Sequence, residues 1–267
     1  MDNRPIGVFD SGLGGLTVVK ELKKCLPGES IVYFGDTARL PYGTRSKDIV
    51  NKYSDQCVRF LLEKNIKMVI VACNTASSTS LETLRKSYDI PILGVINPGA
   101  RAAIKATQNG RIGVIGTAGT IRSRAYPQAM KGIDSNVTVY DQACSLFVPI
   151  VEEGWSNTEV ARLTALKYLQ DIKDKGIDTL VLACTHYPLL SDTISKVMAP
   201  HVRLINPGEG TALSVVDLLR EKDMAREDKT PSQSNFYVSD FGERFQMLGS
   251  HFLNMEIDAE KIDIESY

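Results

Sequence analysis

The feature that most constrains this chain is a short segment that occurs twice, at residues 69–78 and 180–188. In each copy a run of aliphatic residues ends on Ala-Cys and then becomes polar. Short apolar runs bounded by polar turn residues are typical of buried strands in a parallel sheet. The residues after each cysteine, Asn-Thr-Ala-Ser and Thr-His-Tyr-Pro, favour the start of a helix, because they cap it or tolerate its first turn. We therefore expect Cys73 and Cys184 where the carboxyl end of a strand meets the amino end of a helix, which is where open α/β sheets bind ligands.

The repeat is not limited to these two segments. Four pairs of residues in similar local patterns follow the same order, each pair about 105 to 111 positions apart: Gly7 and Gly113, Asp36 and Asp141, Cys73 and Cys184, Asn97 and Asn206. This period is too long for a solenoid and indicates an internal duplication. It predicts an α/β fold of two similar α/β domains with mainly parallel sheets. We expect a pseudo-twofold axis to relate the two domains, with the active site in the cleft between them.

Hydrophobic patterning supplies the remaining elements. Besides the strands that end at the two cysteines, we expect strands at 5–9, 30–35, 90–95, 111–115, 137–140, 202–204 and 235–238. We expect helices at 16–26, 47–63, 158–175, 211–220 and 242–253. The stretch 147–154 is predicted to be a loop.

Composition argues against several classes of function. The formal net charge is −1, so nothing indicates nucleic acid or an anionic membrane as a partner. No apolar run has the length of a membrane span or the character of a signal peptide, and we expect a cytoplasmic protein. Five cysteines, none in C-x-x-C spacing, argue against a disulfide framework and a structural zinc site. We expect the three cysteines outside the repeated segment, Cys25, Cys57 and Cys144, to be inert or structural.

The matched cysteines point to a particular chemistry. If two similar domains pack face to face, Cys73 and Cys184 approach one ligand from opposite sides. That arrangement suits removal of a proton from one face of a carbon and return of a proton to the other face. Thiols suit both roles, because their pKa of about 8.5 is readily lowered at a helix N-terminus. A dinucleotide site on Gly12 and Gly14 is disfavoured, because the third glycine position holds Thr17.

Four motifs carry a resemblance to a known family: Asp-Ser-Gly-Leu-Gly-Gly-Leu at 10–16, Pro-Tyr-Gly at 41–43, Ala-Cys-Asn-Thr at 72–75 and Ala-Cys-Thr-His-Tyr-Pro at 183–188. Together they resemble the glutamate racemases of the cofactor-independent aspartate/glutamate racemase family, and the likeness runs through nearly the whole chain. The resemblance implies interconversion of L- and D-glutamate, the latter for bacterial peptidoglycan. It also implies a homodimer and a reaction without pyridoxal phosphate. We expect no metal, because no metal-ligand spacing is present. One domain would be inserted in the other, so that residues 1–97 with 208–267 form the first domain and 98–207 the second.

The resemblance also implies residue roles. Cys73 and Cys184 would be the two bases, with Asp10 and His186 as their polar helpers and Glu152 near the second thiol. Glu153 is an alternative to Glu152, because the two are adjacent. The residues implied to bind the substrate are Asp10, Ser11, Tyr42, Gly43, Asn74, Thr75, Thr185 and His186.

The sequence is also compatible with other functions. A sister enzyme could racemise aspartate, or decarboxylate a substrate with a single thiol. A non-catalytic, two-lobed amino-acid sensor would close on its ligand, but binding alone does not need two oxidation-prone thiols. A dithiol redox role is disfavoured, because thiols separated by a substrate are poor disulfide partners.

Overall fold

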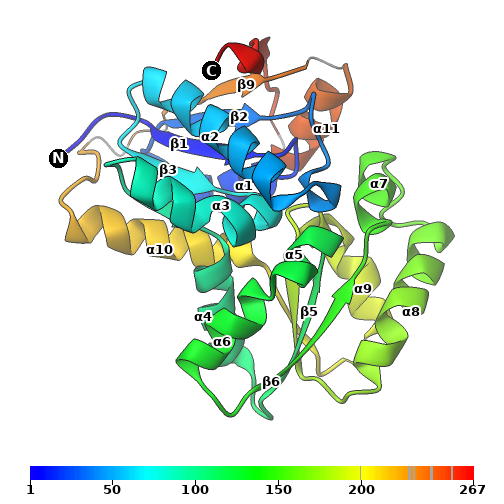
Figure 1. The fold of residues 1–267 in the computed structure, drawn as a ribbon. Coiled ribbons are helices and arrows are strands. Elements are labelled where there is room, and N and C mark those ends of the chain that lie inside the picture. Colours follow the sequence, from blue (N-terminus) through cyan, green and yellow to red (C-terminus); the bar gives the residue numbers. More distant parts are fainter. Residues whose placement is uncertain (199, 228–229, 231, 241–242, 254) are drawn as a thin grey trace.

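The chain forms two parallel β-sheets with helices packed on both faces of each (Figure 1). The structure is a computed structural model, and it describes residues 1–267 except 199, 228–229, 231, 241–242 and 254. The first sheet has the strand order β10 (Ala259–Lys261), β9 (Asn235–Val238), β2 (Ile31–Gly35), β1 (Ile6–Asp10), β3 (Met68–Val71), β4 (Ile92–Gly94). The second has the order β6 (Thr138–Ala143), β5 (Arg111–Gly116), β7 (Thr179–Ala183), β8 (Arg203–Ile205). All the pairings between these strands are parallel.

The two sheets repeat one design, as the sequence predicts. The order β2-β1-β3-β4 in the first sheet corresponds to β6-β5-β7-β8 in the second. The repeat extends to single contacts: a Cβ on Gly7 would lie 2.6 Å from Ile66 Cδ1, and a Cβ on Gly113 would lie 2.6 Å from Ile177 Cδ1. Each glycine therefore lets an isoleucine side chain lie against the centre of its sheet. The predicted fold class, two α/β units with mainly parallel sheets, is confirmed.

The helices cover the sheets on both sides, which explains why the central strands are buried throughout. The helices are α1 (Leu16–Cys25), α2 (Lys47–Glu63), α3 (Asn74–Ser87), α4 (Ile96–Ala106), α5 (Ala118–Ser123), α6 (Ala125–Ile133), α7 (Phe147–Glu152), α8 (Glu159–Lys173), α9 (Ser191–Val197), α10 (Pro207–Glu221) and α11 (Glu243–Leu253). Short 3₁₀ turns are η1 (Tyr42–Thr44), η2 (Tyr187–Leu190) and η3 (Ile264–Ser266). In the second half, α4 and α6 lie on one side of the sheet and α8 and α9 on the other (Figure 1).

After the second sheet the chain returns to the first. Helix α10 packs against α1 and α4, and the strands β9 and β10 then extend the first sheet from the free side of β2 (Figure 1). The strands of the second sheet thus all fall between residues 111 and 205. We propose domain boundaries that follow this division, with 1–97 and 208–267 in one domain and 98–207 in the other.

One predicted detail needs correction. The stretch 147–154, expected to be a loop, contains helix α7, because Pro149 lies in the first turn of that helix, where a missing N–H is not needed. Cys25 lies exposed at the end of α1. The helix predicted at 242–253 is α11, described from Glu243 to Leu253, and Gly242 lies outside the described residues.

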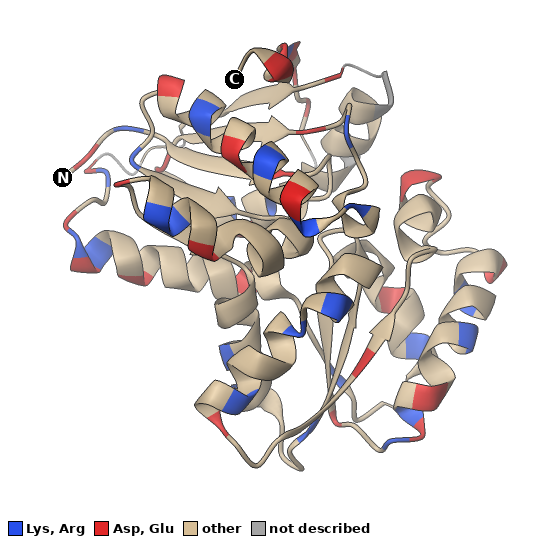
Figure 2. Cartoon of the chain, in the orientation of Figure 1, with Lys and Arg blue, Asp and Glu red and all other residues tan. Residues whose placement is uncertain are grey.

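Charged residues are mixed on the outer surface. In the view of Figure 2, acidic and basic residues alternate along α2, in keeping with the formal net charge of −1. Within the part of the chain that the structure describes, none of the helices is both long and apolar enough to cross a membrane.

Candidate active site

The two cysteines of the repeated segment lie at equivalent positions, just after β3 and β7. Cys73 is the N-cap of α3, and its Sγ accepts a hydrogen bond from the backbone N–H of Ala76 at 3.5 Å. Cys184 stands at the corresponding end of β7 and is followed by the η2 turn. Each cysteine is 6% exposed, and both line the same pocket. The repeated pattern of a strand, a cysteine and polar residues after it therefore positions both thiols in the lining of one pocket.

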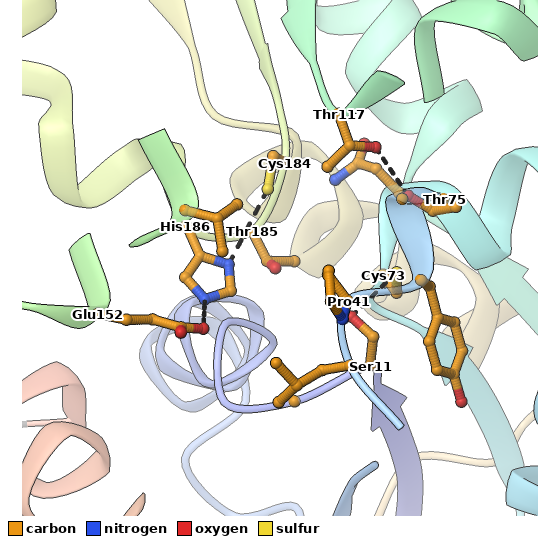
Figure 3. Close-up of a pocket in the computed structure, with 15 residues that line it drawn as sticks. Ser11, Pro41, Cys73, Thr75, Thr117, Glu152, Cys184, Thr185 and His186 are labelled. Atoms are coloured by element: carbon orange, nitrogen blue, oxygen red, sulfur yellow. Dashed lines mark hydrogen bonds and ion pairs between the residues drawn. The ribbon is translucent and has the colours of Figure 1, made fainter. Parts of the chain in front are cut away.

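That pocket has a volume of about 430 Å³, including its open mouth. Its lining residues are Ser11, Gly12, Leu40, Pro41, Tyr42, Gly43, Cys73, Asn74, Thr75, Thr117, Val148, Glu152, Cys184, Thr185 and His186. Figure 3 shows Cys184 beside His186 and Glu152, with Cys73, Ser11 and Pro41 on the other side. Of the residues predicted for the site, all but Asp10 line the pocket.

A chain of polar contacts leads to Cys184. His186 Nδ1 lies 3.9 Å from Cys184 Sγ, and His186 Nε2 lies 3.1 Å from Glu152 Oε1 (Figure 3). Burial lowers the pKa of His186, but its hydrogen bonds to Cys184 and Glu152 outweigh this and raise the pKa to about 10. We therefore expect a cationic His186 at neutral pH, which stabilises negative charge on the neighbouring sulfur. Of the adjacent pair of glutamates, it is Glu152 that lines the pocket.

The surroundings of Cys73 are different. Its Sγ lies 3.6 Å from Ser11 Oγ, and no cation contacts it among the described residues. Burial, together with the nearby Asp10, raises the pKa of the Cys73 thiol to about 12. At neutral pH we expect Cys73 to be a neutral thiol that can give a proton.

Asp10 is fully buried and does not itself line the pocket. Its carboxylate accepts hydrogen bonds from the N–H of Gly12 at 3.0 Å and from Thr185 Oγ1 at 3.4 Å. Burial raises the pKa of Asp10 above its ordinary value, although the charge of His186 and the backbone N–H groups of Gly12 and Gly15 oppose this. Asp10 therefore acts electrostatically on Cys73 and is connected to the other half of the site through Thr185.

The predicted substrate-binding residues do not all present their side chains to the pocket. Asn74 Oδ1 accepts a hydrogen bond from Tyr126 at 2.8 Å, and Thr75 Oγ1 lies 2.9 Å from Thr117 Oγ1. Tyr42 also lines the pocket, but its hydroxyl is hydrogen-bonded to the buried carboxylate of Asp36. A substrate contact through that hydroxyl is therefore not available, and the segment at 41–43 can serve the pocket only through other atoms.

Thr117 lines the pocket but is not among the site residues predicted from the sequence. It is the N-cap of α5, and it joins the two halves of the pocket through its contact with Thr75 (Figure 3). The internal duplication could have indicated it, because the offset that pairs Gly7 with Gly113 also pairs Ser11, a predicted site residue, with Thr117. Leu40 and Val148 add apolar walls, and no pattern in the sequence indicated them.

Comparison with known proteins places this site in a family. Residues 6–214 match the family model described as Asp/Glu/Hydantoin racemase. The chain belongs to this family. The resemblance expected from the four sequence motifs is thereby confirmed.

Relatives within this racemase family are similar over their whole length. A glutamate racemase of Geobacter metallireducens is 48% identical over 264 residues, which cover 98% of each chain. The crystal structure of a glutamate racemase isoform from Bacillus anthracis matches with a TM-score of 0.95 at 38% identity, covering 98% of each chain. A glutamate racemase of Francisella tularensis, solved in complex with D-glutamate, matches with a TM-score of 0.93 at 39% identity over 100% of each chain.

The packing of the racemase site predicts a strong effect of a single methyl group. A Cβ on Gly14 would lie 2.6 Å from His186 Nδ1 and closer still to Thr185 Oγ1. Gly14→Ala must therefore displace both side chains, and small displacements of catalytic groups cost up to about a hundredfold in rate. We expect the rate of racemisation to fall about 10- to 50-fold, measured as initial rates of enantiomer interconversion.

Gly132→Ala is the matched control for this experiment. A Cβ at Gly132, in α6, meets no atom within 4 Å. We expect unchanged rates and a free energy of unfolding higher by up to about 1 kcal/mol, since alanine is the better helix former. Full activity in Gly14→Ala would contradict the placement of His186 next to this turn.

Proposed function

We propose that this protein interconverts L- and D-glutamate by moving a proton at Cα between two thiols, Cys73 and Cys184. The observation that carries the proposal is the pair of cysteines at equivalent strand ends, both lining one pocket. The substrate assignment is supported by full-length relatives named glutamate racemase, one of them solved with D-glutamate. The two enantiomers differ in which face of Cα carries the hydrogen, so one base on each face serves both directions.

The different surroundings of the two thiols suit the proton transfer that the proposal requires. In the direction in which Cys184 is the base, cationic His186 beside its sulfur stabilises negative charge there, and Cys73, with its raised pKa, supplies the proton as the thiol. The thiolate takes the Cα proton, and the electron pair of the C–H bond passes to Cα and its carboxylate. Cys73 then gives its proton to the opposite face of Cα. The cycle leaves Cys184 as thiol and Cys73 as thiolate, the state needed for the reverse reaction.

The rest of the pocket binds the substrate and lowers the energy of the carbanion. Hydroxyl groups of Ser11, Thr75, Thr117 and Thr185, with the amide of Asn74, line the cavity and can donate to the two carboxylates. Preorganised donors in a site with little water stabilise developing negative charge more than water does. We further propose that the reaction uses neither pyridoxal phosphate nor a metal ion, and that a cytoplasmic homodimer supplies D-glutamate for peptidoglycan.

The test is to incubate the purified protein with L-glutamate, without added cofactor, and to follow optical rotation. Rotation should fall to zero as the mixture becomes racemic, and prolonged EDTA treatment should not change the rate. L-Aspartate in the same assay separates glutamate from aspartate racemisation. If optical rotation is lost with L-aspartate but not with L-glutamate, the substrate is aspartate rather than glutamate. If the protein binds glutamate tightly without any loss of rotation, the non-catalytic sensor is favoured.

A further inference from the structure

Part of the pocket wall is made by the segment at 41–43, which approaches the other half of the molecule very closely. A Cβ on Gly43 would lie 2.6 Å from Thr117 Cβ, so a side chain larger than hydrogen does not fit there. The carbonyl of Gly43 is also packed against Gly119 of α5. The shape of the pocket at this point therefore depends on where the backbone of this segment lies, and that backbone needs a fixed support.

The support is a buried ion pair immediately before the segment. Arg39 Nε donates to both oxygens of Asp36, at 2.8 and 3.0 Å, and both side chains are almost inaccessible to solvent. The hydroxyl of Tyr42 donates to the same carboxylate. Ser239, which follows β9, donates to it as well, at 2.8 Å. The carboxylate of Asp36 thus fastens Tyr42, a pocket-lining residue, to an arginine and to the first sheet.

Arg39 also makes a second group of contacts, with residues of α2 and with Glu265 of η3. Its Nη1 donates to Gln56 Oε1 at 2.6 Å and to Glu265 Oε1 at 3.0 Å. The guanidinium lies 4.1 Å above the ring of Tyr53. Gln56 Nε2 in turn donates to the backbone carbonyls of Ile264 and Tyr267, at 3.3 and 3.1 Å. The segment 264–267 therefore closes over the outer side of Arg39 and limits where its guanidinium can lie.

We propose that Arg39 is a positioning residue that fixes the pocket wall at 41–43 through Asp36 and Tyr42, and that the segment 264–267 acts on the site through Arg39. The inference rests on the proposed racemase function, because it assigns this wall to substrate binding. Lysine cannot replace the arginine, since an ammonium group lacks the planar fork that reaches Asp36, Gln56 and Glu265 at once. None of these contacts touches either thiol, so the wall affects substrate binding more than proton transfer.

The test compares Arg39→Lys, Tyr42→Phe and Glu265→Gln with the control Glu260→Gln. Glu265 is 59% exposed, so its substitution does not threaten folding. Glu260 is an exposed acid on the neighbouring strand β10. We expect KM for both enantiomers to rise about tenfold in Arg39→Lys and Tyr42→Phe and two- to threefold in Glu265→Gln, with kcat lowered less than twofold. Glu260→Gln should match the wild type. Calorimetric titration with D-glutamate should show the same order of weakened binding.

The outcomes separate positioning from a structural role. A loss of folded protein lowers the apparent kcat and leaves KM unchanged, and that result in all three variants would overturn the inference. So would KM values within 1.5-fold of the wild type in Arg39→Lys and Glu265→Gln. If Arg39→Lys does not fold, the KM values of Tyr42→Phe and Glu265→Gln still test the inference: values within 1.5-fold of the wild type in both would overturn it. If the wild type binds D-glutamate but does not racemise it, the proposed function fails, and the binding series alone tests the role of Arg39.

Discussion

Replacement of either Cys73 or Cys184 by alanine should lower racemisation at least a thousandfold in both directions. Each thiol is the acid in one direction and the base in the other, so removing one breaks the cycle whichever enantiomer is supplied. Positioned acids and bases contribute about 10²–10⁴-fold each, and residues that act as a unit lose most of their effect when one is removed. The assay is the initial rate of interconversion from pure L- and pure D-glutamate.

The remaining cysteines provide the controls for this prediction. Cys25 is exposed at the end of α1, and Cys57 and Cys144 are buried away from the pocket lining. Alanine at each of these positions should keep most of the activity. Cys57 is the most informative of them, because its Sγ lies 3.7 Å from the hydroxyl of Tyr42 without reaching the pocket. Racemisation retained by Cys73→Ala or Cys184→Ala would rule out the two-thiol mechanism.

Substitution of the helpers should affect the two directions unequally. His186 contacts Cys184, whereas Asp10 acts electrostatically on Cys73. We expect His186→Asn and Asp10→Asn each to lower kcat about 10²-fold in one direction and much less in the other, with the sensitive direction reversed between the two variants. In His186→Asn the cation beside Cys184 is lost, and Glu152 loses its imidazole partner.

Thermodynamics constrains how this asymmetry can appear. Enantiomers have equal free energies in water, so the ratio of kcat/KM between the two directions stays at one in every variant. The ratio of the two kcat values must therefore equal the ratio of the two KM values, as happens when a ground-state complex of one enantiomer shifts in energy. Full kinetics in both directions for both variants supply the check. Equal kcat losses in both directions for both variants would reject this pairing of helpers with thiols.

Repeated local patterns made the centre of the site predictable from sequence. The strand, the Ala-Cys pair and the capping residues occur twice, and this alone placed Cys73 and Cys184 at matching sheet positions. The fold class followed from the same repeat. Helix α7 was missed because Pro149 resembles a turn signal, whereas in the first turn of a helix its missing N–H costs nothing.

Contacts between distant segments were beyond the reach of local patterns. Arg39 and Glu265 are 226 positions apart and meet only because β9 and β10 return to the first sheet. The direction of the Tyr42 hydroxyl depends on the buried Asp36, which no periodicity reveals. The link between His186 and Glu152 depends on helix α7, which local patterning did not indicate. Sequence therefore predicted which residues lie in the site better than how their side chains are used.

The most direct test of the central claim is racemisation in deuterated water, stopped early and analysed for deuterium at Cα of each enantiomer. The thiol that donates the proton exchanges with solvent between turnovers, whereas the proton taken from the substrate stays on the other thiol. With two bases, the product enantiomer should carry deuterium and the remaining starting enantiomer should carry almost none. Heavy early labelling of the starting enantiomer would contradict the account, because it would mean that a single base serves both faces of Cα.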